Sequence, residues 1–368
     1  MARQSIAFDF SASPNDTAGV SDKQRYETMF AVTRTGYQLG YQNVWTFEHN
    51  FTDYFPVPNP LLAYAHMIGQ CPGLGLGTCV VVVPWHNPLF MASQIAMLSI
   101  MGEGHLNIGV GRGTAPYEYK AYGKDMRKAS ILFKESMEII QIALKGKPFT
   151  YRGTELSVET EVEIRPHPRP EKVTFYCATV NPESAKKAAE AGMAMLSAAW
   201  FPLDILKSYT SSFDNLVAEL GGKPREKAIT INLIVCDSDA EAAKRGSVSC
   251  ADFFIASTAH YQSGGLDLGN FLQDNPDYAA TGKFMSYLKM FSNPATNGDY
   301  VAQQLIGTPK TIIKRVRNYI DAGYTRLILQ TDLTGTPRAL QQEYLTRFAK
   351  EIAPEFGVRM AAPRLAAE

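Results

Sequence analysis

The stretch from Leu74 to Val110, LGLGTCVVVVPWHNPLFMASQIAMLSIMGEGHLNIGV, decides the fold of this 368-residue chain. Its beginning, Leu74 to Val83, and its end, His105 to Val110, are apolar runs of the kind that form buried strands. Leu89 to Met101 lies between them and has the length and composition of a helix. A strand, a helix and a second strand in this order form the unit from which parallel α/β folds are built.

The same unit recurs on both sides of this stretch. Further strands are expected at Ser5–Phe10, Asn43–Glu48, Thr174–Ala178, Met193–Ala198, Ile229–Cys236 and Arg326–Gln330. Further helices are expected at Asp22–Leu39, Leu61–Ile68, Lys128–Leu144, Pro182–Ala191, Leu203–Leu220, from Asp239 onward, at Pro309–Ala322 and at Pro337–Ile352. Eight strands with intervening helices, and no Gly-x-Gly-x-x-Gly after the first strand, favour an α/β fold of the (β/α)8 TIM-barrel type over a doubly wound dinucleotide fold.

Two segments interrupt the repeat. Residues 147–170 combine turn residues with alternating apolar positions, which predicts a β-hairpin excursion after the fourth unit. Residues 261–300 are rich in glycine, asparagine and proline, which predicts a long loop over the active face before the last unit. We expect both to be insertions in one domain that spans residues 1–368.

Composition limits the partners of the chain. Lysine plus arginine and aspartate plus glutamate number 36 each, so no excess of positive charge favours nucleic acid or an anionic membrane. The apolar run Cys79–Trp85 is too short to span a bilayer, and Met1–Phe10 lacks the pattern of a signal peptide. We therefore expect a soluble, cytoplasmic protein without a nucleic-acid or membrane partner.

Neither cysteines nor histidines show the spacing of a metal site. The five cysteines include no CxxC pair, which is typical of reduced, buried thiols. The six histidines, at positions 49, 66, 86, 105, 167 and 260, form no i, i+4 pair and no His-x-His cluster. The sequence predicts no required metal.

Several motifs, in order, resemble those of the luciferase-like flavin-dependent monooxygenases. They are VWTFEHNFTDY at Val44–Tyr54, GTCVVVVPWHNP at Gly77–Pro88, LNIGVGRG at Leu106–Gly113, YEY at Tyr117–Tyr119, ATVNPESAKKAAEAG at Ala178–Gly192 and IGTP at Ile306–Pro309. The resemblance covers nearly the whole chain and implies a TIM barrel that binds a phosphorylated flavin.

The resemblance also implies a reaction. The expected enzyme takes reduced FMN from a separate NAD(P)H:flavin reductase, forms a flavin C4a-peroxide with O2 and inserts one oxygen atom into a small organic substrate. Relatives commonly form homodimers through their early helices, and we expect the same here. Two alternatives stay open: an oxidoreductase of the same superfamily that uses the deazaflavin F420, and a flavin-binding protein without catalysis.

His49 is the candidate catalytic residue. It follows the second expected strand, at the carboxyl end where catalytic groups of TIM barrels gather. An imidazole there can exchange protons with flavin or substrate near neutral pH. The alternative is a histidine that only forms hydrogen bonds at the strand–loop junction.

Two segments are candidates for the flavin phosphate. Arg112 lies between two glycines, which let backbone and guanidinium approach phosphate oxygens; a surface salt bridge is the alternative. Asn181, Glu183 and Ser184 surround a predicted helix start, where free N–H groups and the Ser184 hydroxyl would receive phosphate and Glu183 would lie behind them. The alternative for this second segment is an ordinary helix cap.

The remaining candidates concern the ring and the substrate. In the resembled family a non-proline cis peptide lies beneath the flavin ring, and the matching bond here joins Cys79 to Val80. We assign both residues to flavin packing, with no redox role for the thiol. Tyr117 and Trp200 follow expected strands and are candidates for the substrate pocket, although aromatic residues at such positions also serve as core packing.

Overall fold

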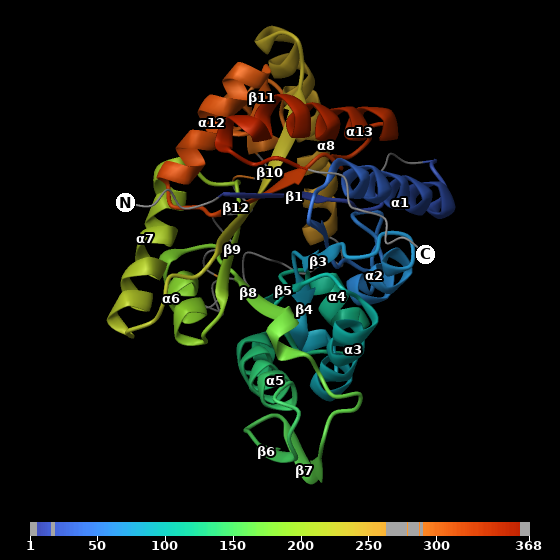
Figure 1. The fold of residues 1–368 in the computed structure, drawn as a ribbon, viewed down its shortest axis with the longest axis vertical. Helices are drawn as coiled ribbons and strands as arrows, with labels where there is room; N and C mark the ends of the chain where they lie inside the picture. The colour runs from blue at the N-terminus through green and yellow to red at the C-terminus, as the bar shows by residue number, and fades with distance from the viewer. Residues whose placement is uncertain (1–5, 16–18, 263–277, 279–286, 288–289, 361–368) are drawn as a thin grey trace.

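Eight parallel strands close into a barrel in the computed structural model, which describes residues 6–15, 19–262, 278, 287 and 290–360. The strands are β1 (Ala7–Ser11), β2 (Asn43–Thr46), β3 (Gly75–Thr78), β5 (Leu106–Gly111), β8 (Val173–Ala178), β9 (Ala194–Ala198), β10 (Lys227–Val235) and β12 (Arg326–Gln330). Each pairs with the next in this order, and β12 pairs with β1. The expected (β/α)8 barrel is confirmed (Figure 1).

Helices follow the strands and surround the barrel (Figure 1). They are α1 (Asp22–Leu39), α2 (Pro60–Ile68), α3 (Pro88–Met101), α5 (Ala129–Ala143), α6 (Pro182–Glu190), α7 (Leu203–Glu219), α8 (Asp239–Gln262), α12 (Pro309–Asp321) and α13 (Arg338–Arg347). The closing helix expected to reach Ile352 changes to a π-helical turn at Phe348–Ile352. Within the described ranges, no helix combines the length and apolar character that crossing a bilayer requires.

Besides short 3-10 turns, two short helices and one short strand were not expected from the sequence. They are α4 (Pro116–Ala121), α11 (Gly298–Gln303) and β11 (Leu305–Gly307), which pairs with β10. In addition, the strand expected at Leu74–Val83 is split into β3 and β4 (Val81–Val82), which both pair with β5. The split leaves Cys79 and Val80 between two strand segments instead of inside one regular strand.

The predicted insertions have different outcomes. The hairpin is confirmed as β6 (Phe149–Arg152) paired with β7 (Ser157–Val162), and it projects at the lower end of Figure 1. The Glu135 carboxylate of α5 holds its turn by accepting hydrogen bonds from three consecutive backbone N–H groups, at residues 154–156. Most of the loop expected at residues 261–300 lies outside the described residues.

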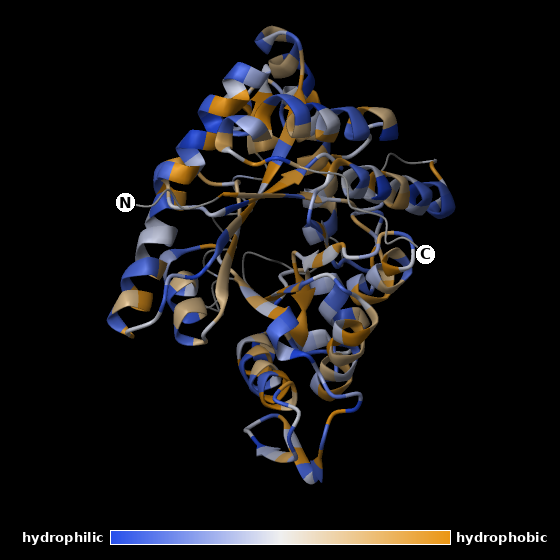
Figure 2. Ribbon diagram, viewed as in Figure 1, coloured by the Kyte–Doolittle hydropathy of each residue, from blue (hydrophilic) through white to orange (hydrophobic). Residues whose placement is uncertain are grey.

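A small cluster of side chains fills the barrel interior. It comprises Trp45, Tyr176, Ala194, Leu196, Ala228 and Ile328, with Cys79 and Val80 packed against it. Apolar residues concentrate along the strands (Figure 2). Trp45 meets the Tyr176 ring edge-on at 5.4 Å between centroids and donates from Nε1 to Asp9 at 2.8 Å. The interior is therefore a packed core, as is usual for this fold.

Gly77 is required by the Trp45 ring. A Cβ added at Gly77 would lie 1.9 Å from Trp45 Cδ2, inside the core. We expect Gly77→Ala to lower the free energy of unfolding by about 2 kcal/mol or more, because a packed interior tolerates added volume poorly. Urea unfolding would measure the loss.

Gly69→Ala is the matched control. Within the described part of the chain, and apart from its neighbours in sequence, no atom lies within 4 Å of the position that its Cβ would occupy, and its φ of −68° suits alanine. This variant should unfold within about 0.5 kcal/mol of the parent chain. Equal stability of the two variants would contradict the packing assigned to Trp45.

Candidate active site

The residues predicted for catalysis and binding gather at one end of the barrel. His49 follows β2, the Cys79–Val80 bond follows β3, Arg112 follows β5, Asn181 follows β8 and Trp200 follows β9. Because neighbouring strands are parallel, their carboxyl ends meet at the same face. The sequence thus placed its candidates on one face, but it did not show which of them touch.

The Cys79–Val80 peptide bond is cis, as the family resemblance implied. Gly111 of β5 makes room for it, since a Cβ there would lie 2.7 Å from Val80 Cγ2. Burial raises the pKa of the Cys79 thiol well above its ordinary value, and the carboxylates of Asp332 and Asp9 add to the shift. Cys79 is therefore a protonated packing residue and not a nucleophile.

Glu48 holds the segment that follows this bond. Its Oε2 accepts a hydrogen bond from the Val82 N–H at 2.7 Å, and its Oε1 lies 2.6 Å from His86 Nε2. Burial raises the pKa of Glu48, while His86 and the Val82 N–H partly oppose the shift. Glu48 therefore connects the end of β2 with β4.

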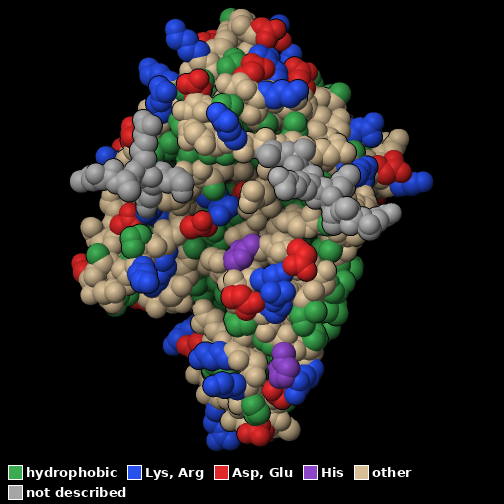
Figure 3. All heavy atoms as spheres, viewed as in Figure 1, with side chains coloured by type: hydrophobic (Ala, Val, Ile, Leu, Met, Phe, Trp, Pro, Cys, Tyr) green, Lys and Arg blue, Asp and Glu red, His purple; other side chains and the backbone are tan. Residues whose placement is uncertain are grey.

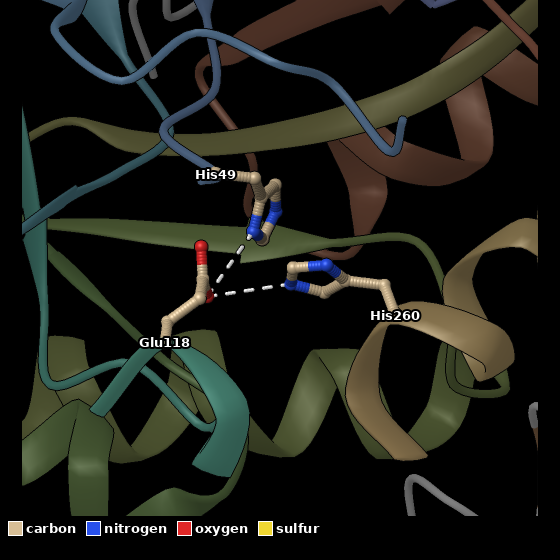
Figure 4. A group of neighbouring side chains, drawn as sticks. All are labelled: His49, Glu118 and His260. Atoms are coloured by element: carbon tan, nitrogen blue, oxygen red, sulfur yellow. Dashed lines mark ion pairs between the residues drawn. The ribbon is translucent and has the colours of Figure 1, made fainter. Parts of the chain in front are cut away.

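His49 belongs to a buried cluster with Glu118 of α4 and His260 of α8 (Figure 4). Glu118 Oε2 lies 3.8 Å from His49 Nδ1 and 3.3 Å from His260 Nε2. Burial lowers the pKa of His49, and His260 adds to the decrease while Glu118 opposes it. Burial alone would raise the pKa of Glu118, but the two histidines outweigh it and the net shift is downward. The cluster therefore favours a carboxylate beside a neutral His49 that can accept a proton.

Neighbouring groups orient this cluster from behind. The Asn50 N–H donates to Glu118 Oε1 at 2.5 Å, and Thr52 Oγ1 lies 2.6 Å from His260 Nδ1. Tyr122 extends the network by donating from its hydroxyl to Asn50 Oδ1 at 2.9 Å. The loop after β2 thus fixes both partners of His49.

Arg112 is anchored at the end of β5. Its Nη1 donates to Ser130 Oγ at 2.6 Å, and its guanidinium lies over the Tyr278 ring at 5.0 Å from the centroid. Gly113 adopts a φ of +72°, which favours glycine, and the Tyr119 hydroxyl donates to the Arg112 carbonyl oxygen. Tyr119 therefore shapes this turn. The phosphate contact of Arg112 stays a prediction.

The start of α6 forms a complete capping box. Asn181 Oδ1 accepts from the Ser184 N–H at 2.7 Å, and Ser184 Oγ accepts from the N–H groups of Val180 and Asn181 at 3.0 and 3.1 Å. Glu183 is exposed, and its Oε1 lies 3.9 Å from Lys187 Nζ. These contacts match the ordinary cap that was the alternative interpretation. A phosphate role for Asn181, Glu183 and Ser184 stays a prediction.

The two candidate pocket residues are half-buried. Tyr117 on α4 contacts Phe51 edge-on, with 6.3 Å between ring centroids. Trp200 packs against the main core after β9. Both lie on the expected face, and their contact with substrate is a prediction.

Three consecutive residues at the end of β12 bring polar atoms to the same face. Within the described part of the chain, Gln330 Nε2, Thr331 Oγ1 and Asp332 Oδ2 are buried and have no hydrogen-bond partner. Asp332 Oδ1 accepts from Ser11 Oγ at 2.8 Å. Buried polar atoms without partners are rare, so these atoms fit a polar ligand at the barrel mouth.

The opposite end of the barrel holds a polar cavity of about 480 Å³. Its charged lining is already paired: Arg326 contacts Asp9 Oδ2 and Glu226 Oε1 at 2.5 and 2.9 Å. His105 Nε2 lies 2.9 Å from Thr174 Oγ1. These contacts link the amino-terminal ends of strands and have the character of a structural network.

Sequence reasoning missed Glu118, His260 and Asp332. Glu118 stands between Tyr117 and Tyr119 in a quoted motif, and an acidic residue inside an aromatic group was an available signal. Asp332 follows an apolar strand within the run Gln330-Thr-Asp, which was a second signal. His260 had no local signal, because its partners lie on distant segments.

Comparison with known proteins gives a family match. A sequence model described as luciferase-like monooxygenase matches residues 6–326. The oxygenase component of a flavin-dependent trigonelline monooxygenase from Acinetobacter baylyi is 31% identical over 34% of this chain and 36% of its own length. The chain spans about half the length of the first relatives it matches, at 44% and 57%.

Solved structures share the fold at low identity. The oxygenating constituent of 3,6-diketocamphane monooxygenase from Pseudomonas putida, in complex with FMN, is 20% identical with a TM-score of 0.70, and the match covers 95% of this chain and 99% of that one. An F420-dependent secondary alcohol dehydrogenase in complex with an F420-acetone adduct is 16% identical with a TM-score of 0.72, over 93% and 98%.

The pH dependence of stability tests the burial of Asp332. Burial raises the pKa of its carboxyl group from 3.8 to about 6, so the folded chain holds this proton more tightly than the unfolded chain. The ionised group therefore costs stability above pH 6, by up to about 3 kcal/mol, and this cost disappears as the pH falls toward 4.

We expect the stability of the parent chain to rise, relative to that of Asp332→Asn, as the pH is lowered from 7 to 5. Urea unfolding of both proteins at several pH values would measure the difference, in which the other titrating groups cancel. Parallel pH profiles would show that Asp332 titrates normally.

Proposed function

The chain belongs to the luciferase-like monooxygenase family, and on this premise we propose that it is the flavin-dependent oxygenase of a two-component system. It takes reduced FMN from a separate NAD(P)H:flavin reductase in the cytoplasm and inserts one atom of O2 into a small organic substrate. The other oxygen atom leaves as water, and the flavin is oxidised.

One observation carries the proposal: the barrel mouth combines a packing surface, buried polar groups and a largely buried histidine. Val80 and Cys79 pack on the interior core, and His49 lies at the end of the neighbouring strand β2. The buried polar atoms of residues 330–332 lie at the end of β12. An isoalloxazine ring, with apolar faces and a polar edge, has the chemistry that matches this surface.

The residues present fit a phosphorylated flavin. Arg112 at the end of β5 would bind the phosphate, together with N–H groups at the start of α6 on the adjacent strand β8. Cys79 and Val80 would support the ring. When bound, reduced FMN supplies the two electrons that activate O2, and the barrel supplies orientation and exclusion of water.

His49 would move the proton that oxygen transfer requires. Burial lowers the pKa of its imidazole, which favours the neutral form that can accept a proton from substrate. Glu118 would stabilise the imidazolium that results, since its Oε2 lies 3.8 Å from His49 Nδ1. Tyr117 and Trp200 would border the substrate.

FMN is preferred over F420 because monooxygenases are named among both the relatives and the structural neighbours, one of them in complex with FMN. The F420-dependent neighbour matches the fold equally well, so use of F420 is the alternative that the binding experiment tests. A flavin-binding protein without catalysis is the third outcome, and the experiments below separate the three.

Anaerobic titration with reduced FMN tests the cofactor site. We expect Arg112→Ala to weaken binding about 10- to 100-fold, because it removes a charged hydrogen-bond donor to phosphate. Arg127→Ala is the control, since Arg127 is exposed and pairs with Asp125. His49→Gln should bind reduced FMN as tightly as the parent chain but should no longer form product. Product formation would be measured with a flavin reductase, isotopically labelled O2 and a panel of aldehydes, ketones and aromatic compounds.

Three results would change the assignment. Tight binding of F420 without binding of FMN would favour the deazaflavin enzyme. FMN binding with no labelled product across the panel would favour the non-catalytic protein. Full product formation by His49→Gln would remove His49 from the mechanism.

We also infer a homodimer formed through α2 and α3. These helices contain no lysine, arginine, aspartate or glutamate, yet they expose large apolar side chains. The exposed residues are Leu62, Phe90, Met97, Ile100 and Met101. Figure 3 shows hydrophobic side chains gathered along the lower right edge, over α2 and α3. An apolar patch of this kind is typical of a subunit interface.

Sedimentation equilibrium tests the dimer. We expect the parent chain to be dimeric and Phe90→Glu combined with Met101→Glu to shift it to monomer, because buried charges without partners oppose association. Val248→Glu, on the exposed side of α8, is the matched control and should leave the dimer intact. A monomeric parent chain would contradict the inference.

A further inference from the structure

The cluster around His49 has the arrangement of a metal centre. His49 Nδ1, Glu118 Oε2 and His260 Nε2 all lie within 4.8 Å of one another, and the ion pairs drawn from both histidines meet at the Glu118 carboxylate (Figure 4). We propose that these three side chains bind one divalent transition-metal ion of the Zn²⁺ type. The site amends the expectation from histidine spacing, which indicated no metal.

The distances from Glu118 to the two histidines are close to those between ligands of one metal ion. Bonds of about 2.0–2.2 Å at tetrahedral angles place the ligand atoms about 3.3–3.6 Å apart. Glu118 Oε2 lies 3.3 Å from His260 Nε2 and 3.8 Å from His49 Nδ1, whereas a charge-assisted N–H···O bond is about 2.7–2.9 Å long. Among the described residues, neither Glu118 Oε2 nor His49 Nδ1 has a hydrogen-bond partner.

Two of the proposed ligands, Glu118 and His260, make a hydrogen bond through the side-chain atom that does not face the ion, as metal ligands commonly do. The Asn50 N–H binds Glu118 Oε1, which leaves Oε2 directed toward the histidines. Thr52 Oγ1 contacts His260 Nδ1, which leaves Nε2 directed toward Glu118. A hydrogen bond to the second ring nitrogen, such as that between Thr52 and His260, fixes the orientation of a ligating imidazole and raises the metal affinity of the site.

The donor set selects the class of ion. Two imidazoles and one carboxylate suit Zn²⁺, Co²⁺ or Fe²⁺, whereas Mg²⁺ and Ca²⁺ prefer oxygen ligands only. Three protein ligands leave a position for water or another small ligand. The His49 side chain is 13% exposed while Glu118 and His260 are 1% exposed, so the ion would enter past His49.

Metal and proton compete for the same atom. An ion bound to His49 Nδ1 prevents that nitrogen from interacting with Glu118, so metal loading would slow any turnover that depends on the imidazole. The metal site itself does not depend on the flavin chemistry, because all of its ligands come from the chain.

Titration of the metal-free full chain with Co²⁺, without flavin, tests the site. We expect one equivalent to bind with the intense visible absorption of tetrahedral cobalt, and one equivalent of Zn²⁺ to displace it. Glu118→Gln and His260→Gln should each weaken binding at least 10-fold. His167→Gln, which changes an exposed histidine, should bind like the parent chain.

Thr52→Val provides a second readout if the ligand variants fail to fold. It retains all three ligands and removes the contact to His260, so we expect binding about 10-fold weaker. The absence of stoichiometric binding by the folded parent chain, or binding by folded His260→Gln equal to that of the parent, would overturn the proposal. Because no flavin is present, this result is independent of the oxygenase assignment.

Discussion

The buried carboxylate of Asp9 is the interaction on which the barrel depends. It lies on β1 and binds three side chains from the strands on either side: Asn43 and Trp45 of β2 donate to it at 2.9 and 2.8 Å, and Arg326 of β12 forms an ion pair with it at 2.5 Å. A buried charge is tolerated only when it is paired, so the first and last strands are held beside each other. This contact joins the two ends of the sheet.

Closure positions the candidate site. With the barrel closed, the Trp45 ring and its neighbours fill the interior, and Cys79 and Val80 rest on this core. The carboxyl ends of β2, β3, β5 and β12 then form one rim that carries His49, the cis peptide bond, Arg112 and the polar run ending at Asp332. Each group comes from a different strand, so an open sheet would not hold them in this arrangement.

Sequence patterns predicted the parts of the protein that depend on local chemistry. The strands, the long helices and the hairpin follow from hydrophobic period and turn residues, which act over short distances. Helix α4 was not expected, because six residues make too few backbone hydrogen bonds to give a clear pattern. The cis bond at Cys79–Val80 was expected only from the family resemblance, since no local pattern specifies it.

The candidate site was partly predictable for the same reason. His49 and Arg112 were found because each follows a recognisable strand. Glu118 and His260 were not, since their importance comes from contact with each other and with His49 across three distant segments. The structure therefore leaves the candidate site where the sequence placed it and reveals which residues contact the predicted ones.

The central claim is that this barrel mouth holds reduced FMN and controls its reaction with oxygen. The most direct measurement is stopped-flow absorbance: the chain is loaded with reduced FMN anaerobically and mixed with O2, and the absorbance of oxidised flavin is recorded. The account predicts that oxidised flavin appears after a lag and more slowly than from free FMN. Reoxidation at the rate of free FMN, with no lag, would contradict it.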